Sequence, residues 1–327
     1  MLDYQKILGL ISDNNTFIIT SHINPDADAI GSEIAVKYYL DSIGKESRII
    51  NCSPTPANLS FLDKSNVIEK YDADRHNSLI EDADVIILID FNHISRTAGM
   101  EDSIKKSEAV TICIDHHEAN DPHADYLLID TEYSSAGEIV YELLECDKNL
   151  EWNIELALPV YAAIMTDTGS FRFERTSERT HKMAARLIAL GVDPHSTHRI
   201  IYDQMSVNQL KLLGRVLESV DKDDSGSICY MNLTRADLEA TGTSEEDIEG
   251  FVNYTMKVKD VKIGLLFYEL ENGFKISFRS IGNIPVNKLA GDFGGGGHLN
   301  AAGTRITGKR MEEYIGKVVS RAADYLK

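Results

Sequence analysis

Two short runs of apolar residues, VIILI at 85–89 and VTICI at 110–114, constrain the fold of this chain more than any other feature. Neither run alternates apolar with polar residues, as a strand does when one of its faces meets water. Continuous runs of this length are typical of strands that are buried on both faces of a parallel sheet. The sequence therefore predicts an α/β fold with helices on both sides of the sheet.

The first 130 residues alternate strand-like and helix-like segments, as expected for a doubly wound domain. A run with β-branched residues at 16–21 is followed by a helical pattern at 29–43, which Gly44 ends. Further strands are expected at 47–51, 84–90, 110–115 and 126–130.

The rest of the chain has a different pattern. Residues from about 134 to 219 are mostly helical in their spacing of apolar residues. Strands near 228–233, 261–269 and 274–280 then precede a glycine run, another strand and a closing helix at 311–326. We therefore predict an N-terminal domain at 1–185, a helical linker at 186–222 and a smaller α+β domain at 223–327 that closes over a cleft.

Acidic residues and histidines follow directly after the predicted strands and one later apolar segment. They are His22, Asp26, Asp28, Asp90, Asp115, His116, His117 and Asp167. Ligands of open α/β sheets bind just beyond the carboxyl ends of the strands, so these side chains are expected to meet at one edge. Each of them alone could be an ordinary helix cap or turn residue. Because all of these residues occur at strand ends in the same half of the chain, caps and turns alone explain the whole set poorly.

Four of these carboxylates, from Asp26, Asp28, Asp90 and Asp167, would repel one another strongly within a few ångströms. Two divalent cations would neutralise them. Imidazole and carboxylate ligands without thiolate suit Mn²⁺, Fe²⁺ or Zn²⁺ better than Ca²⁺. Two such ions about 3.5–4 Å apart can activate water and hold a phosphoryl group for in-line displacement. The pattern therefore predicts a two-metal site for phosphate esters.

The acidic composition limits the kind of ligand. The chain has 52 acidic against 33 basic residues, a formal net charge of −19, whereas long nucleic acids are held by many phosphate contacts on a basic face. A polyanionic ligand is therefore expected to be short. No apolar run reaches the roughly 18–20 residues of a membrane span, and the start of the chain does not resemble a secretion signal. Four scattered cysteines without a C-x-x-C pair indicate reduced thiols, so we expect a cytoplasmic protein.

These motifs resemble those of the DHH phosphoesterase superfamily. The matching elements, in order, are His22-x-x-x-Asp26-x-Asp28 with Gly31-Ser32, the isolated Asp90, Asp115-His116-His117 and Asp167. The sequence FGGGGHLNAAG at 293–303 is similar to the motif of the DHHA1 domain that accompanies it, and the resemblance covers essentially the whole chain. In length and in the Arg279-Ser280 element, the chain looks most like the nanoRNase/pAp-phosphatase branch.

The resemblance implies two metal ions, for which Mn²⁺ is the expected identity. The implied ligands are His22, Asp26 and Asp90 for one ion, and Asp28, Asp90, His116 and Asp167 for the other. Asp90 would bridge the two ions, and His117 would face the scissile phosphate. Asp115 would support the ligands beside it, a role whose loss typically costs about 10–100-fold in metal affinity or activity.

The glycine run and several arginines are the predicted substrate contacts. A poly-glycine stretch alone is more often a flexible loop, but its backbone N–H groups can form an anion-binding nest, and the resemblance favours that interpretation. Arginine suits phosphate because its planar fork binds in two places. The predicted contacts are Gly295, Gly296, Gly297, His298, Asn300, Arg279, Arg172 and Arg96. Arg175 and Arg179 are interpreted as solvated residues at the start of a helix.

The activity implied by the resemblance is metal-dependent hydrolysis of short oligoribonucleotides to nucleoside 5′-monophosphates, and of 3′-phosphoadenosine 5′-phosphate (pAp) to AMP and phosphate. Cleavage of cyclic di-AMP or its linear product is an alternative within the same chemistry. A metal-dependent nucleotide sensor without turnover is an alternative of another class. The GGGGH sequence disfavours a family II pyrophosphatase, and the short, acidic chain disfavours a RecJ-like exonuclease on long strands. A homodimer is compatible with this branch.

One motif points to a different chemistry. Asp167-Thr168-Gly169-Ser170 matches the DTGS string of aspartic proteases. That mechanism needs two such carboxylates that share a proton. The chain has a single copy, flanked by helical sequence, so the match is interpreted as coincidental.

Overall fold

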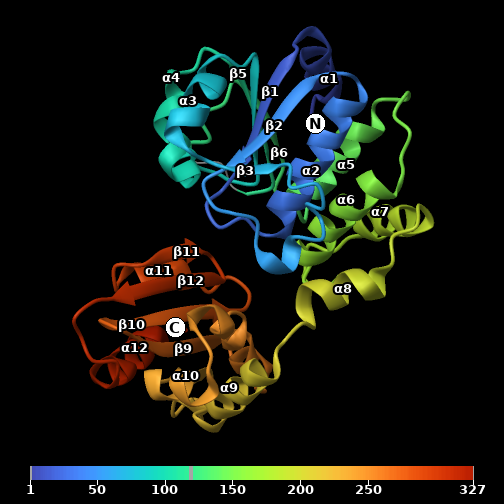
Figure 1. Cartoon of the computed structure of the whole chain (residues 1–327). Coiled ribbons are helices and arrows are strands. Elements are labelled where there is room, and N and C mark those ends of the chain that lie inside the picture. Colours follow the sequence, from blue (N-terminus) through green and yellow to red (C-terminus); the bar gives the residue numbers. More distant parts are fainter. Residues whose placement is uncertain (1, 118–120, 327) are drawn as a thin grey trace. The chain divides into compact units, whose positions relative to one another are not determined.

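The computed structural model describes residues 2–117 and 121–326, apart from the side chain of His298. The chain divides into two compact units, Met1–Gln204 and Met205–Lys327. In Figure 1 the first unit runs from blue to yellow and the second from yellow to red. Each unit has its own sheet and its own core.

A six-stranded sheet with the order β3-β2-β1-β4-β5-β6 forms the centre of the first unit. All of its strand pairs are parallel. The strands are β1 (Thr16–Ser21), β2 (Glu46–Asn51), β3 (Ile68–Lys70), β4 (Val85–Ile89), β5 (Val110–Asp115) and β6 (Tyr126–Ile129). The order reverses between β1 and β4, which makes the carboxyl ends of these two strands the expected binding position. The predicted doubly wound parallel sheet is confirmed.

Helices cover both faces of this sheet (Figure 1). Alternate residues of β4 show the two faces: Val85, Ile87 and Ile89 belong to one apolar cluster, and Ile86 and Leu88 to another. The first face packs on α1 (Tyr4–Asp13), α2 (Ala27–Ser42), α5 (Ala136–Glu145), α6 (Ile154–Asp167) and α7 (Glu178–Ala189). The second packs on α3 (Ala73–Glu81), the 3-10 helix η2 (Ile94–Met100) and α4 (Glu101–Lys106). Burial from both sides explains why the VIILI and VTICI runs do not alternate.

Two of these helices approach each other closely. A Cβ atom on Gly31 of α2 would lie 2.3 Å from the carbonyl oxygen of Pro159 in α6. Only glycine fits at such a contact, because any side chain would overlap the backbone of the neighbouring helix. The close packing fixes α2, which begins with Asp28 in its first turn, against α6, which ends at Asp167.

The second unit has a six-stranded sheet with the order β11-β12-β10-β9-β8-β7. The pairs are antiparallel except β8 with β9. The strands are β7 (Asp221–Lys222), β8 (Ile228–Leu233), β9 (Ile263–Leu270), β10 (Gly273–Ser280), β11 (Gly296–His298) and β12 (Ala301–Ile306). The expected smaller α+β region is therefore present.

Alternation along β10 separates the two faces of the second sheet. Phe274, Ile276 and Phe278 pack on α11 (Val286–Gly291) and α12 (Glu312–Asp324). The opposite face of the sheet is partly covered by α9 (Val207–Glu218), α10 (Arg235–Thr241) and the 3-10 helices η3 (Glu245–Ile248) and η4 (Phe251–Lys257). The intervening residues of β10, beginning with Lys275, lie on that side.

The helices of the predicted linker fall on both sides of the division between the units. Helix α8 (Pro194–Tyr202) belongs to the first unit and α9 to the second. The proposed bounds of 1–185, 186–222 and 223–327 stay a prediction. Within the described ranges, no helix is long and apolar enough to cross a membrane.

Candidate active site

The predicted histidines and aspartates come together at the carboxyl edge of the first sheet. His22 follows β1, Asp90 follows β4, and His116 follows Asp115 at the end of β5. Strands β1 and β4 lie next to each other at the point where the strand order reverses. The parallel topology therefore brings residues that are distant in sequence to one place.

The first group of candidate ligands consists of His22, Asp26 and Asp90. One ligand atom from each lies within 4.8 Å of the others. The Nε2 atom of His22 is 3.4 Å from Oδ2 of Asp90. Asp26 caps α2 and accepts hydrogen bonds from the backbone N–H groups of Asp28 and Ala29, at 2.9 and 3.2 Å. The cap of α2 is therefore Asp26 and not Asp28, the residue for which a cap is the simple sequence interpretation. The cap bonds hold the Asp26 carboxyl group beside His22 and Asp90.

The second group consists of Asp28, His116 and Asp167, again with ligand atoms within 4.8 Å of one another. The Nε2 atom of His116 is 3.1 Å from Oδ2 of Asp167 and 3.8 Å from Oδ2 of Asp28. It is also 3.5 Å from Oδ1 of Asp90. The two oxygens of Asp90 thus face the histidines of the two groups.

Hydrogen bonds from α5 orient the buried carboxylate of Asp28. Its Oδ2 accepts from the backbone N–H of Ala136 at 2.7 Å, and its Oδ1 from that of Gly137 at 2.8 Å. A carboxylate at a helix N-terminus is favoured by these otherwise unpaired donors and by the helix dipole. No local pattern predicts this contact, since the partners are more than 100 positions apart in the chain.

Asp115 holds the two histidines that follow it. Its Oδ1 accepts from the backbone N–H of His116 at 2.8 Å and lies 2.7 Å from Nδ1 of His117. This contact makes Nδ1 of His117 the protonated donor and directs its other ring nitrogen away from Asp115. His117 is partly exposed, whereas Asp115 is fully buried. The geometry suits a supporting role for Asp115.

The backbone at Asp90 has an unusual conformation. Its φ angle is 61°, in the left-handed region, and its N–H donates to the carbonyl of Ile114 at 3.0 Å. Aspartate and asparagine adopt this conformation more readily than other non-glycine residues. Strained backbone of this kind is frequent where a side chain has to be aimed at a functional position.

Several buried polar atoms of the cluster have no hydrogen-bond partner among the described residues. They are Oδ1 of Asp90, Oδ2 of Asp115 and both ring nitrogens of His116. Leaving a buried polar group unpaired costs roughly 1–3 kcal/mol. Imidazole nitrogens and carboxylate oxygens without protein partners are the donor set that divalent transition metals use. The residues present therefore fit a pair of divalent cations.

The charges of the cluster shift the pKa values of its histidines. Burial alone would lower the pKa of His22, but Asp90 and then Asp26 raise it to about 9. Burial also opposes protonation of His116, whereas Asp167 and Asp90 raise its pKa well above the ordinary value. Both imidazoles are thus held in the charged form by their carboxylate neighbours.

The carboxylates respond to the same charges. Burial, followed by the charges of Asp90 and Asp167, raises the pKa of Asp28 well above its usual range. Burial of its carboxyl group, followed by the charges of Asp90 and Asp167, raises the pKa of Asp26 to about 6, although the residue as a whole is exposed. Burial would raise the pKa of Asp90 as well, but His116 and His22 hold it below the ordinary value. The cluster thus carries protons that a divalent cation would displace.

A buried network beneath the cluster was missed by the sequence interpretation. The side-chain amide of Asn51 donates to Oε2 of Glu33 at 2.8 Å, and its Oδ1 accepts from the backbone N–H of Ser21 at 3.2 Å. Burial raises the pKa of Glu33 to about 8. The network fixes the end of β1 directly before His22. Glu33 lies in a helical pattern like any other polar residue, so no local signal could have identified it.

The predicted arginines of the first unit lie near the cluster in different settings. The carbonyl of Arg96 accepts from the N–H of Ile23 at 2.7 Å, next to His22. Arg172 is exposed and donates from Nε to the carbonyl of Gly169 at 2.6 Å. Arg179 lies over the ring of Tyr133 at 3.6 Å and is engaged there. Arg179 is therefore packed and paired rather than solvated as expected, because Tyr133 and Glu138 lie beside the start of α7.

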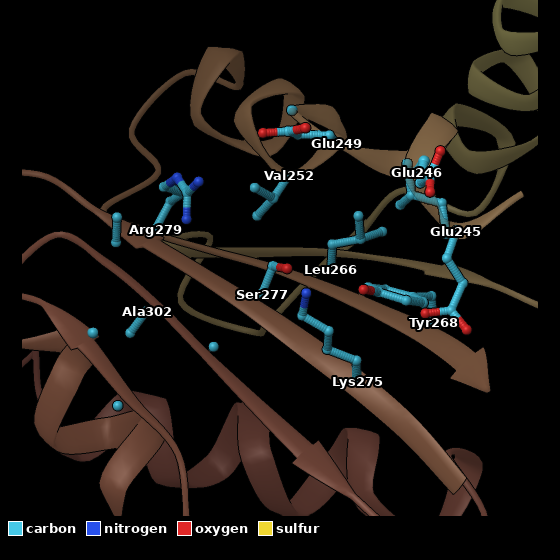
Figure 2. Close-up of a pocket in the computed structure, with 16 residues that line it drawn as sticks. Glu245, Glu246, Glu249, Val252, Leu266, Tyr268, Lys275, Ser277, Arg279 and Ala302 are labelled. Carbon is cyan, nitrogen blue, oxygen red and sulfur yellow. The ribbon is translucent and has the colours of Figure 1, made fainter. Parts of the chain in front are cut away.

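The second unit contains a cavity of about 510 Å³ (Figure 2). Three successive outward residues of β10 line it: Lys275, Ser277 and Arg279. Figure 2 shows these side chains along one strand, below the segment that carries Glu249 and Val252. The glutamates of the cavity wall are Glu245, Glu246 and Glu249, and the glycines are Gly250, Gly296, Gly297 and Gly303.

Some predicted contacts of the second unit line this cavity and others do not. Arg279, Gly296 and Gly297 line the cavity. Gly295 and Asn300 are not part of the lining, and the amide of Asn300 donates to Oγ of Ser280 and to the carbonyl of Gly282, at 2.9 and 2.8 Å. The side chain of His298 lies outside the described part of the structure. Lys275 and Ser277 were missed, although the alternation of polar and apolar residues in GFKISFRS marks them.

Comparisons with known proteins agree with this architecture. Residues 16–166 match the model of the DHH family, N-terminal domain, and residues 225–327 match that of the DHHA1 domain. The chain is 31% identical over 309 residues to the bifunctional oligoribonuclease and PAP phosphatase NrnA of Thermus thermophilus, which covers 94% of this chain and 89% of that protein. This chain belongs to the DHH phosphoesterase family.

As a DHH phosphoesterase, the protein is a hydrolase that acts on phosphoester bonds. Among solved structures it is similar to an exopolyphosphatase-related protein from Bacteroides fragilis, with a TM-score of 0.91, 31% identity and coverage of 98% of this chain and 95% of that one. It is also 26% identical to the cyclic-di-AMP phosphodiesterase GdpP of Bacillus subtilis, over 97% of this chain but 49% of that protein. The predicted DHH and DHHA1 resemblance is confirmed.

Proposed function

We propose that this DHH phosphoesterase hydrolyses short oligoribonucleotides to nucleoside 5′-monophosphates and pAp to AMP and phosphate. The observation that carries the proposal is the position of Asp90, whose two carboxylate oxygens lie 3.4 Å from His22 and 3.5 Å from His116. Asp90 thus lies between two groups of candidate ligands, each of which contains a histidine. A carboxylate shared in this way suits a pair of adjacent cations. The NrnA protein named above supports the choice of substrates.

The proposed ligands follow the two groups of the cluster, with Mn²⁺ as the expected ion. They are His22, Asp26 and Asp90 for one cation, and Asp28, Asp90, His116 and Asp167 for the other. When bound, two such cations supply an activated water and stabilise the negative charge that develops on the phosphoryl oxygens. The hydrogen bonds from Ala136 and Gly137 keep the Asp28 carboxylate oriented toward the cluster.

His117 is proposed to contact the scissile phosphate. Its Nδ1 lies 2.7 Å from Oδ1 of Asp115, which holds the ring with its Nε2 edge turned away from that carboxylate. Arg96 and Arg172 are proposed to add positive charge near the same phosphate.

The cavity of the second unit is proposed to hold the non-reacting end of the substrate. Arg279 contributes a guanidinium that Asn253 and the carbonyl of Phe278 hold in place, at 3.2 and 2.9 Å. Lys275 and Ser277 add an ammonium and a hydroxyl on the same face of β10. A volume of about 510 Å³ suits a nucleotide-sized group rather than a long strand. We keep Gly295, His298 and Asn300 as proposed contacts from the family resemblance alone.

Cyclic di-AMP or its linear product is a second candidate substrate. The similarity to GdpP, which extends over 97% of this chain, favours it. The same cation ligands and the same cavity would serve these dinucleotides and short oligoribonucleotides, since all of them present a phosphodiester between nucleosides. A sensor without turnover is the remaining alternative. It would bind these nucleotides tightly and release no product.

We also propose that the protein works in the cytoplasm and that it can form a homodimer. The four cysteines, Cys52, Cys113, Cys146 and Cys229, are free thiols, as is usual in a reducing compartment. Light scattering of the purified protein measures the oligomeric state directly.

The test of the proposed function is a rate comparison with Mn²⁺ on pApA, pAp and cyclic di-AMP, for wild type and Asp90→Asn. Asparagine accepts the left-handed backbone of Asp90, so the variant should stay folded. We expect turnover of pApA and pAp by wild type and a loss of more than about 100-fold in the variant, beyond the usual effect of outer-shell residues. Equal, negligible rates for both proteins on all three substrates would overturn the proposal.

A further inference from the structure

The loop after Asp167 has an unusual backbone. Three successive residues, Gly169, Ser170 and Phe171, have φ angles of 56°, 59° and 63°. Glycine adopts this left-handed conformation freely, but each non-glycine residue in it is strained. Such conformations persist only where the surrounding structure determines them, and they concentrate at functional positions.

Hydrogen bonds determine the shape of this loop. The N–H groups of Gly169 and Ser170 donate to carbonyls in the last turns of α6, at 2.9 and 2.8 Å. The N–H of Phe171 donates to Oγ1 of Thr168 at 3.0 Å, and those of Arg172 and Phe173 donate to the Thr168 carbonyl at 2.9 and 3.0 Å. Every backbone N–H from 169 to 173 is therefore paired, and the loop is rigidly built.

The two phenylalanines of the loop differ in burial. Phe171 packs inside, against the rings of Tyr161 and His181. Phe173 remains 57% exposed. The ring of Phe173 lies directly over Gly169, because a Cβ atom on that glycine would be 2.4 Å from the ring. The strained loop thus holds an apolar ring at the surface, six residues after a candidate metal ligand.

Exposure of an aromatic ring is rare in this chain. The sequence has 14 tyrosines, ten phenylalanines and one tryptophan, all within the described ranges, and only Phe173 and Tyr202 are strongly exposed, at 57% and 43%. Tyr202 ends α8 in the same unit. Partial burial, and after it the charges of Asp167 and Asp26, raise the pKa of Tyr202 to about 12. The ring of Phe173 lies over Gly169, two residues from the cluster residue Asp167.

We propose that Phe173 is a stacking surface for the nucleobase of the nucleotide whose phosphate lies at the carboxylate cluster. This inference rests on the proposed function. Aromatic rings beside a phosphate site bind bases by stacking, which tolerates any base because every base has a flat apolar face. Arg172, whose Nε is held by Gly169 beside this ring, is placed to contact the phosphate of the same nucleotide.

The test compares pAp with an abasic 3′,5′-bisphosphate that carries both phosphates and no base. We expect Phe173→Ala to raise KM for pAp by about 5–150-fold, the usual worth of one stacked base, with a smaller change in kcat. The abasic substrate should show no difference between wild type and variant. Phe173→Tyr should keep the low KM for pAp, because the stacking face is retained.

Ile188→Ala is the matched control, since Ile188 is a 42% exposed apolar residue on α7. It should leave KM unchanged for both substrates. The same change in KM for pAp and for the abasic substrate in Phe173→Ala would overturn the stacking inference, as would no change for either.

A binding experiment separates this inference from the proposed hydrolysis. The bisphosphate of 2-aminopurine riboside is titrated with protein that has been loaded with Mn²⁺, since fluorescence of this base falls when it stacks. Quenching by wild type and its loss in Phe173→Ala would support the inference even if no turnover were found. Equal fluorescence changes with both proteins would contradict it, whereas the rates on pApA, pAp and cyclic di-AMP decide the proposed function.

Discussion

The Nδ1 atom of His117 lies 2.7 Å from Oδ1 of Asp115, the same oxygen that accepts the backbone N–H of His116 at 2.8 Å. One buried carboxylate thereby fixes both members of the histidine pair. His116 is held toward Asp28, Asp90 and Asp167, and His117 toward the partly open side of the cluster. The two histidines therefore have different surroundings, which fits the different tasks proposed for them.

Asp115→Asn tests that division of tasks. Asparagine keeps the shape of the side chain but removes the charge that orients and polarises His117. We expect kcat on pAp to fall by about 10–100-fold, with the thermal midpoint nearly unchanged. Asp125→Asn is the control, because Asp125 accepts from Thr111 at the opposite end of β5. A kcat for Asp115→Asn within twofold of wild type would exclude a supporting role for this carboxylate.

Gly137→Ala tests the contact between α5 and Asp28. A Cβ atom at this position would lie 2.6 Å from Cβ of Ala163 and 3.2 Å from Oδ1 of Asp28. We expect the variant to lose about 1–3 kcal/mol of unfolding free energy and to bind Mn²⁺ more weakly, as measured by denaturation and by metal titration.

Gly9→Ala is the control for that experiment, since a Cβ atom on Gly9 in α1 would meet no atom within 4 Å. Alanine there should be neutral or stabilising by up to about 1 kcal/mol. Should Gly137→Ala behave like Gly9→Ala in both measurements, the close approach of α5 to Asp28 would be wrong.

Asp84 links the fold of the first unit to pH. Its carboxylate accepts from the backbone N–H groups of Asn15 and Thr16, at 3.0 and 2.9 Å, and these bonds hold its pKa below the ordinary value. A lowered pKa in the folded state adds stability that is present above the unfolded pKa of about 3.9. That stability is lost as the pH falls through the lower pKa of the folded state.

Asp84→Asn should therefore lower the thermal midpoint at neutral pH, and its difference from wild type should shrink below about pH 4. Thermal unfolding followed by circular dichroism from neutral to acidic pH measures this difference. A difference that grows toward acidic pH would contradict the assignment.

Arg279→Met tests the cavity of the second unit. Removing the guanidinium should raise KM for pApA by about 10–150-fold, the value of a charge-assisted hydrogen bond of roughly 1.5–3 kcal/mol. The effect on kcat should be smaller, because Arg279 is proposed to contact only the non-reacting end. Arg310→Met removes an exposed arginine that pairs with Glu312 and serves as control. If kcat falls and KM does not change, Arg279 does not bind that end of the substrate.

The sequence was sufficient for the core of the sheet and for the composition of the carboxylate cluster. The VIILI and VTICI runs predict β4 and β5 because burial on both faces leaves a local signal in the strand itself. Parallel topology then requires that Asp90 and His116, at the ends of neighbouring strands, lie together. Strand β3, with the sequence IEK, was missed, because a three-residue edge strand has no apolar pattern.

Features that depend on contacts between distant segments were not predictable. The hydrogen bonds of Asp28 with Ala136 and Gly137 join residues 108 and 109 positions apart. The left-handed backbone of Ser170 and Phe171 is imposed by Thr168 and the end of α6 against the preference of both residue types. Neither feature leaves a pattern that one sequence can show.

Anomalous diffraction from crystals soaked with Mn²⁺ tests the central claim most directly, because it locates each ion without depending on turnover. We expect two Mn²⁺ sites in the first unit, both within coordination distance of Asp90, one beside His22 and the other beside His116. A single site, or sites that do not include Asp90, would contradict the proposed two-metal centre.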